Sequence, residues 1–102
     1  MLIDRFPNKL ADEKLILAFE YGEELDSGET LTGTPTVSVA VRSGTDATPE
    51  ALLNGTPAIV GSDVLLPVKG GIVGVDYQIE VVCPTSNSNK VLARIGKLYI
   101  ED

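Results

Sequence analysis

The chain has 102 residues, of which 43% are hydrophobic, and its 15 Asp and Glu outnumber its 8 Lys and Arg, giving a formal net charge of −7. This length fits one domain, and the charge has the wrong sign for neutralising the phosphates of nucleic acid or an anionic membrane surface. The sequence has no histidine and a single cysteine, Cys83, which excludes an internal disulfide and removes the usual partner of a nucleophilic cysteine and the commonest zinc ligand. We therefore predict no enzymatic activity, no metal site and no cofactor.

The N-terminal residues do not fit the pattern of the rest of the chain. They carry charges at Asp4 and Lys9 and a proline at Pro7, so they lack the continuous apolar stretch of a signal peptide. No run of about 18 apolar residues occurs, so no membrane-spanning helix is expected, and the protein should be made in the cytoplasm. We predict that residues 1–13 form a flexible arm ahead of a domain spanning residues 14–102. The candidate partner contacts on this arm are its apolar residues, Leu2, Ile3, Phe6 and Leu10.

The next segment, ADEKLILAFEYG, is compatible with two secondary structures. Its Ala, Glu, Lys and Leu favour helix, whereas Leu15, Leu17, Phe19 and Tyr21 alternate as in a half-buried strand. We predict a strand. The acidic run that follows has no intervening Lys or Arg and is predicted to be a solvated loop, with a cation or partner site as the alternative. It consists of Glu20, Glu23, Glu24, Asp26 and Glu29.

Two further segments alternate with the period of a strand. In TVSVAVRSG the three valines share one face, and in SDVLLPVKGG the residues Val64, Leu66 and Val68 do the same. Pro67 cannot donate a ladder hydrogen bond, so it predicts an edge position for the second of these strands.

The segment TPEALLNG carries the signals of one short helical turn between these strands. Thr48 suits the N-cap, where its side chain can accept a hydrogen bond, and Pro49 suits the first helical position. Gly55 can take the left-handed conformation that ends a helix.

The stretch GGIVGVDY combines a glycine-rich turn with the start of a strand. Gly70, Gly71 and Gly74 can adopt the positive φ that other residues resist. Tyr77 follows this turn and precedes inward positions, which is the spacing of a tyrosine corner, where the hydroxyl bonds back to the preceding loop. We interpret Tyr77 as structural rather than catalytic.

The last two strands are separated by the polar hairpin loop PTSNSNK. Cys83, at the end of the first, is expected to be a buried small hydrophobe. In the second, the apolar residues change phase at Gly96, which predicts a β-bulge there, with a merely amphiphilic strand as the alternative.

About seven short strands separated by turns predict an all-β fold. We expect an antiparallel β-sandwich of the immunoglobulin or fibronectin type III kind, with one short helical turn.

Three motifs, taken in order, resemble those of small phage and prophage virion proteins described as fiber-tail adaptors. They are the SGET turn beginning at Ser27, the SGTDATP segment at residues 43–49, and the glycine-rich turn ending at Tyr77. The likeness covers residues 14–100, and the first thirteen residues do not match.

The resemblance implies an immunoglobulin-like virion protein at a head-tail or tail-fiber junction, without enzyme activity. Its partners would be other tail, neck or fiber proteins, and it would be a monomer when free and a ring oligomer in the particle. In a ring, many copies turn a weak pairwise contact into a stable collar. The competing hypothesis is a carbohydrate-binding sandwich, which the shortage of aromatic residues disfavours.

Overall fold

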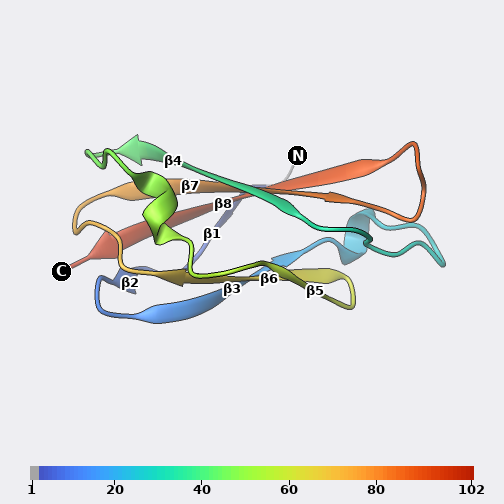
Figure 1. Cartoon of the computed structure of the whole chain (residues 1–102), viewed down its shortest axis with the longest axis horizontal. Helices are drawn as coiled ribbons and strands as arrows, with labels where there is room; N and C mark the ends of the chain where they lie inside the picture. The colour runs from blue at the N-terminus through green and yellow to red at the C-terminus, as the bar shows by residue number, and fades with distance from the viewer. Residues whose placement is uncertain (1–2) are drawn as a thin grey trace.

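The computed structural model of the chain describes residues 3–102, apart from the side chain of Ile3. Within that range two β-sheets pack face to face in an elongated molecule of 43 × 21 × 21 Å (Figure 1). The elements are β1 (Ile3–Arg5), β2 (Lys9–Leu10), β3 (Lys14–Glu20), η1 (Gly22–Glu24), β4 (Thr36–Ser43), η2 (Pro49–Leu52), β5 (Ala58–Val60), β6 (Asp63–Lys69), β7 (Asp76–Pro84) and β8 (Val91–Glu101).

The sheet order is that of an immunoglobulin sandwich. One sheet runs β3-β6-β5, and the other runs β8-β7-β4 with β1 and β2 added beside β8. In the immunoglobulin scheme these correspond to strands B-E-D and G-F-C. The predicted all-β sandwich is therefore confirmed, and the ambiguous segment ADEKLILAFEYG contains a strand, β3.

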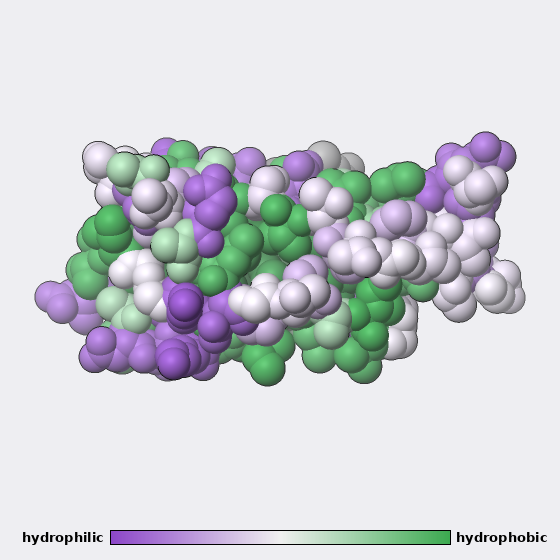
Figure 2. Space-filling view, viewed as in Figure 1, coloured by the Kyte–Doolittle hydropathy of each residue, from purple (hydrophilic) through white to green (hydrophobic). Residues whose placement is uncertain are grey.

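The core lies between the sheets and is formed by alternate residues of each strand. Figure 2 shows hydrophobic surface where the two layers meet, while hydrophilic residues gather most densely at the lower left, the end where β2 and the start of β3 lie, with a smaller group at the end that carries the β7–β8 hairpin. The alternation predicted for the strands matches the observed burial, because every second side chain points inward. Fully buried residues include Phe19, Tyr21, Val64, Leu66, Val68, Tyr77, Ile79, Val81, Cys83, Leu98 and Ile100.

The predicted bulge at Gly96 is wrong. Strand β8 pairs with β7 without a register shift from Val91 to Tyr99, and its inward face is continuous. The inward positions of β8 are Leu92, Arg94, Gly96, Leu98 and Ile100. Because two of them hold Arg94 and Gly96 instead of large apolar residues, the sequence suggests a change of phase that the strand does not have. The register irregularity in this sheet lies instead in β4, between Val41 and Ser43.

The predicted edge position of β6 is also wrong, since β6 lies between β3 and β5. Pro67 is nevertheless compatible with this central strand, because β5 ends before reaching it. The carbonyl of Pro67 accepts a hydrogen bond of 3.1 Å from the amide of Asn54. The nitrogen and carbonyl of one strand residue point to the same side, so the missing N–H of Pro67 costs no bond to β3.

The predicted flexible arm is wrong for residues 3–10, which contain two short strands. Strands β1 and β2 both pair with β8 in parallel, so the five-stranded sheet is not purely antiparallel. The two strands are interrupted next to Pro7, which has no N–H to offer β8. Leu2 lies outside the described residues, and Leu10 is 44% exposed.

Phe6 has a place in the sandwich that the sequence did not reveal. Its ring meets that of Phe19 edge-on, with the centroids 5.2 Å apart. The space for this pair comes from Gly96, because a Cβ at that position would overlap the Phe6 ring and would lie 2.9 Å from the Phe19 ring. The glycine that was interpreted as a bulge is therefore a packing site for the N-terminal segment.

Lys9 fastens the same segment to the rest of the molecule. Its side chain is fully buried, and its ammonium group donates to the carbonyls of Gly70 at 2.6 Å, Leu10 at 2.9 Å and Ala11 at 3.4 Å. Burial lowers the pKa of Lys9, and the three carbonyls take all three of its N–H groups.

Candidate functional site

The predicted structural residues around Tyr77 form one hydrogen-bonded cluster. The Tyr77 hydroxyl accepts a bond of 3.0 Å from the amide of Ile72, five residues upstream, as in a tyrosine corner. It also donates to Asp46 Oδ2 at 2.6 Å. Burial, followed by this bond, raises the pKa of Tyr77 to about 12, whereas the pKa of Asp46 is lowered, chiefly by the Tyr77 hydroxyl.

The residues flanking this cluster shape its turns. Gly70, Gly71 and Gly74 have φ values of +61°, +97° and +86°, and Gly71 also lies against Ile100 too closely for a side chain. These conformations explain the glycine-rich turn.

The predicted N-cap at Thr48 is only partly right. Pro49 is at the start of η2, but no side-chain bond from Thr48 caps it. Instead the Thr48 amide donates to Asp46 Oδ1 at 2.9 Å. The Asp46 carboxylate therefore joins the SGTDATP segment to the glycine-rich turn, which assigns both motifs to the framework of the fold.

The acidic run after β3 is not simply solvated. Lys90, in the β7–β8 hairpin, donates to Glu29 Oε1 at 2.8 Å and to the Glu24 carbonyl at 2.6 Å. Thr85 donates to Glu29 Oε2 at 3.0 Å. These bonds lower the pKa of Glu29, with Lys90 as the main cause. They tie the SGET turn to the hairpin, so this motif is also structural.

One surface remains without such an assignment, namely the free edge of β3. Among the described strands, β3 pairs only with β6, because β1 and β2 pair with β8 in the other sheet. The outward side chain of Ile16, in the middle of β3, is 67% exposed, the highest value among the large hydrophobic residues. An edge strand with unpaired N–H and C=O groups is a template for adding another strand.

A groove of about 600 Å³ runs along this edge, within the size range of ligand sites. We call it the β3 groove. One side is the segment Phe6–Asn8, and the other side is β3 itself. Its lining residues are Phe6, Pro7, Asn8, Glu13, Leu15, Ile16, Leu17, Ala18 and Glu20.

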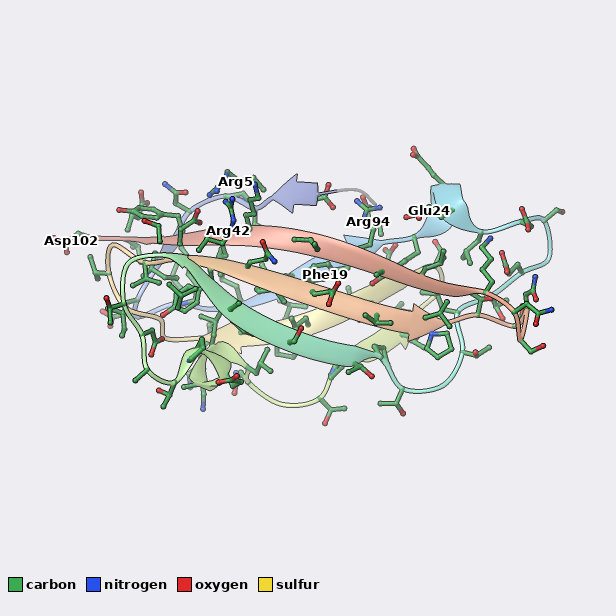
Figure 3. All side chains as sticks on the ribbon, turned by 90° about the horizontal axis from the view of Figure 1, so that it is seen from above. Arg5, Phe19, Glu24, Arg42, Arg94 and Asp102 are labelled. Atoms are coloured by element: carbon green, nitrogen blue, oxygen red, sulfur yellow. The ribbon has the colours of Figure 1, made fainter. Side chains whose placement is uncertain are left out.

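A polar hollow of about 490 Å³ adjoins the groove and shares Glu20 with it. Arg94 reaches this hollow from β8 and donates to Asp4 and to the Glu20 carbonyl, while Glu24 Oε1 lies 3.8 Å from its guanidinium. Figure 3 shows Arg94 and Glu24 near the same end of the sandwich. Glu23 and Asp63 add two further carboxylates, so the hollow is predominantly acidic. The remaining lining residues are Gly22 and Ser62.

The opposite edge of the same sheet is formed by β5, which has only three residues, and a short edge strand offers few unpaired groups. Beyond the end of β5, the edge of β6 is met by the segment after η2, through the Leu53–Val68 bridge and the Asn54–Pro67 bond. In the other sheet, the β4 edge carries a register irregularity near Arg42, and such irregularities discourage strand pairing. Within residues 3–102, no strand pairs with the outer edge of β3, and no register irregularity interrupts it.

The sequence predicts partner contacts on the N-terminal segment and does not single out the edge of β3. The signal was present in the alternation of KLILAFE, whose outward positions hold Ile16 and Ala18 rather than polar residues. That β3 is at an edge depends on the pairing of the N-terminal segment with β8.

The described residues 3–102 contain no group of three or more His, Cys, Asp or Glu side chains placed to hold a metal ion. Their helical turns are too short to cross a bilayer. Comparison of the chain with protein-family models, with curated proteins and with solved structures gives no match.

Proposed function

We propose that the protein is a structural component of a phage or prophage particle, an adaptor at a head-tail or tail-fiber junction that acts through contacts with other virion proteins. The observation that carries the proposal is the ordered set of three motifs, which resembles small virion proteins of this kind. Under this proposal the protein is synthesised in the bacterial cytoplasm and becomes part of the particle.

The contacts of the motif residues support this proposal. Glu29 of the SGET turn bonds to Lys90 and Thr85, and Asp46 of the SGTDATP segment bonds to Tyr77. The three motifs thus hold the two ends of a rigid sandwich rather than line a reaction centre. A rigid sandwich with an unpaired edge is suited to joining other proteins.

A carbohydrate-binding module is less well supported. Sugar platforms need exposed aromatic rings, whereas Phe19, Tyr21 and Tyr77 have no exposed surface. The hydroxyl of Tyr21 is also engaged, since it donates to the Val81 carbonyl at 2.6 Å.

Quantitative mass spectrometry of purified particles from a host carrying the gene tests the proposal. We expect a small fixed copy number per particle, equal to a multiple of the rotational symmetry of the tail. Particles from a gene deletion, complemented with the wild-type gene, provide the control. Intact particles that lack the protein would overturn the proposal and leave an assembly factor or a binding module.

A further inference from the structure

We propose that the free edge of β3 is an acceptor for an extended segment of a different protein, which adds as a fourth strand to the β3-β6-β5 sheet. The segment is apolar at its centre and carries Lys or Arg toward the polar hollow. That its donor is a virion protein rests on the proposed function, whereas the acceptor edge is a property of the fold.

The backbone of β3 offers hydrogen bonds in the right direction. The amide of Tyr21 bonds to the Ser62 carbonyl, next to β6, so the odd-numbered residues of β3 face β6 and the even-numbered ones face the groove. The groove therefore receives the N–H and C=O groups of Ile16 and Ala18. Arg94 donates a hydrogen bond to the carbonyl of Glu20. Because this carbonyl is already bonded, an added strand would end here.

The sheet is one strand short of its immunoglobulin counterpart. In that fold the sheet order is A-B-E-D, with strand A beside B. Here strands β1 and β2 pair with β8, and the three-stranded sheet ends at β3, the equivalent of B. None of the residues 3–102 occupies the position of an A strand beside β3.

The side chains around the vacancy define the segment that would fit. Phe6, Leu15 and Leu17 line the groove and offer an apolar surface to the inward side chains of an added strand. Alternate side chains on its other face would lie beside Ile16 and Ala18. A central run of apolar or β-branched residues satisfies both faces.

Charge determines what flanks that apolar run. Carboxylates stand at both ends of the groove, at Glu13 and Glu20. The adjoining hollow adds three more, from Asp4, Glu23 and Asp63, against the single cation of Arg94. A Lys or Arg of the partner would complete this charge pattern and would speed its association.

A second copy of the chain fits less well than a single extended segment. Its N-terminal strands are already engaged by β8 and by the buried ammonium of Lys9. Each copy also carries a net charge of −7, which opposes association.

The test uses the purified full-length chain and an mRNA-displayed library of random peptides of about ten residues, enough to span β3 at about 3.3 Å per residue. Peptides are selected on the wild-type chain and counter-selected on Ile16→Pro. Proline at this position removes an N–H that faces the groove and leaves the bonds to β6 intact, so the sandwich should fold. The matched control is Ile16→Thr, which changes the side chain but keeps the N–H.

We expect enriched peptides that alternate apolar residues and carry Lys or Arg, and that bind Ile16→Pro at least about tenfold more weakly than the wild-type chain. Ile16→Thr should stay within about threefold of wild type, because strand addition draws its affinity from the main chain. Hydrogen exchange at the amides of Ile16 and Ala18 should slow when the peptide binds. Peptides N-methylated at alternate residues should lose binding, which tests the proposal even if Ile16→Pro does not fold.

Three results would overturn the proposal. They are the absence of enrichment over Ile16→Pro, protection of the β4 or β5 edge in place of β3, and protection of β3 by concentration-dependent dimers without peptide. The last would make a second copy the occupant.

This test is separable from that of the proposed function. If the chain is in the particles but binds no peptide, only the acceptor edge is wrong. If peptides bind to β3 but the chain is missing from the particles, the virion role is wrong and the edge remains.

Discussion

The hydrogen bonds of the Tyr77 hydroxyl to Ile72 and Asp46 can be tested by substituting single residues. Tyr77→Phe removes the hydroxyl and leaves the amide of Ile72 and the carboxylate of Asp46 without their partner. We expect the free energy of unfolding to fall by about 0.5–1.5 kcal/mol, the net contribution of a typical intramolecular hydrogen bond, because both partners can reach water. Urea denaturation measures it. In the Asp46→Ala background the same change should cost less, and equal costs in both backgrounds would contradict a shared bond.

The raised pKa of Tyr77 predicts that folding stability decreases at alkaline pH. Its pKa is raised to about 12 in the folded state, against about 10 in an unfolded chain. Above pH 10 the unfolded state loses this proton first, so stability should fall as the pH rises from about 10 to 12. Tyr77→Phe should show a shallower decline when thermal unfolding is followed across this range. Parallel pH profiles for the two proteins would exclude this contribution.

The buried ammonium of Lys9 gives a third test at the residue scale. Lys9→Met keeps most of the side-chain volume but removes the donors that serve Gly70, Leu10 and Ala11. We expect a loss of about 1–3 kcal/mol in the free energy of unfolding, because carbonyls are left unpaired. The control is Lys69→Met, whose side chain is exposed and should change stability by less than about 0.5 kcal/mol. A Lys9→Met variant as stable as wild type would mean that water replaces the ammonium.

At the scale of elements, the attachment of the N-terminal segment depends on Gly96. Gly96→Ala places a methyl group against the rings of Phe6 and Phe19, and overpacking of this kind costs about 1–3 kcal/mol. We expect the Phe6 ring to be displaced and β1 to lose protection in hydrogen exchange.

The Phe6→Leu background provides the comparison for that variant. The smaller side chain relieves part of the clash, so Gly96→Ala should be less damaging there, as a double-mutant cycle would measure. Gly22→Ala is the matched control, because its new Cβ meets only the flexible Ser62 side chain. Additive effects of the Phe6 and Gly96 changes would contradict the contact.

Strand pairing also explains why the exposed edge is at β3. The N-terminal strands could cover either sheet, and they lie on β8, where Phe6 fills the space above Gly96 and Arg5 pairs with Asp76 at 3.0 Å. Arg42 approaches the same carboxylate at 3.6 Å, and Figure 3 shows Arg5 and Arg42 near one another. Such exposed pairs contribute little energy, so the aromatic contact and Lys9 are the main anchors.

For the whole molecule, two hydrogen-bonded clusters at opposite ends of the sandwich couple stability to acid pH. The carboxyl groups of Glu29 and Asp46 both have pKa values lowered below their ordinary 4.5 and 3.8. Their contribution is complete above pH 4.5 and is lost as the pH falls through the folded-state values. We expect the urea concentration at the unfolding midpoint to decrease when the pH is lowered below about 4.

Matched variants separate this effect from general acid unfolding. The double variant Glu29→Gln, Asp46→Asn should be less stable at pH 6 and should lose less on going to pH 2. Glu23→Gln, whose side chain is exposed, should follow the wild-type profile. A double variant with the wild-type pH dependence would show that other carboxyl groups control acid unfolding.

The alternation of side chains was enough to predict much of the fold. The valines of β4, the inward residues of β6 and the start of β7 at Tyr77 were all identified, because a half-buried strand imposes a period of two on its sequence. The errors at Gly96, Pro67 and residues 1–13 share one cause. Each depends on which strand lies alongside, and local sequence does not encode a neighbour from a distant part of the chain.

The candidate site divides in the same way. Composition and periodicity by themselves determined an acidic, all-β sandwich with turns shaped by glycine, since those properties follow from charge and from local backbone preference. Only the tertiary structure decided that β1 and β2 join β8, that Arg94 turns inward to the Glu20 carbonyl, and that the edge of β3 stays open. These outcomes depend on contacts between residues more than 70 positions apart, where packing and hydrogen bonding override local preference.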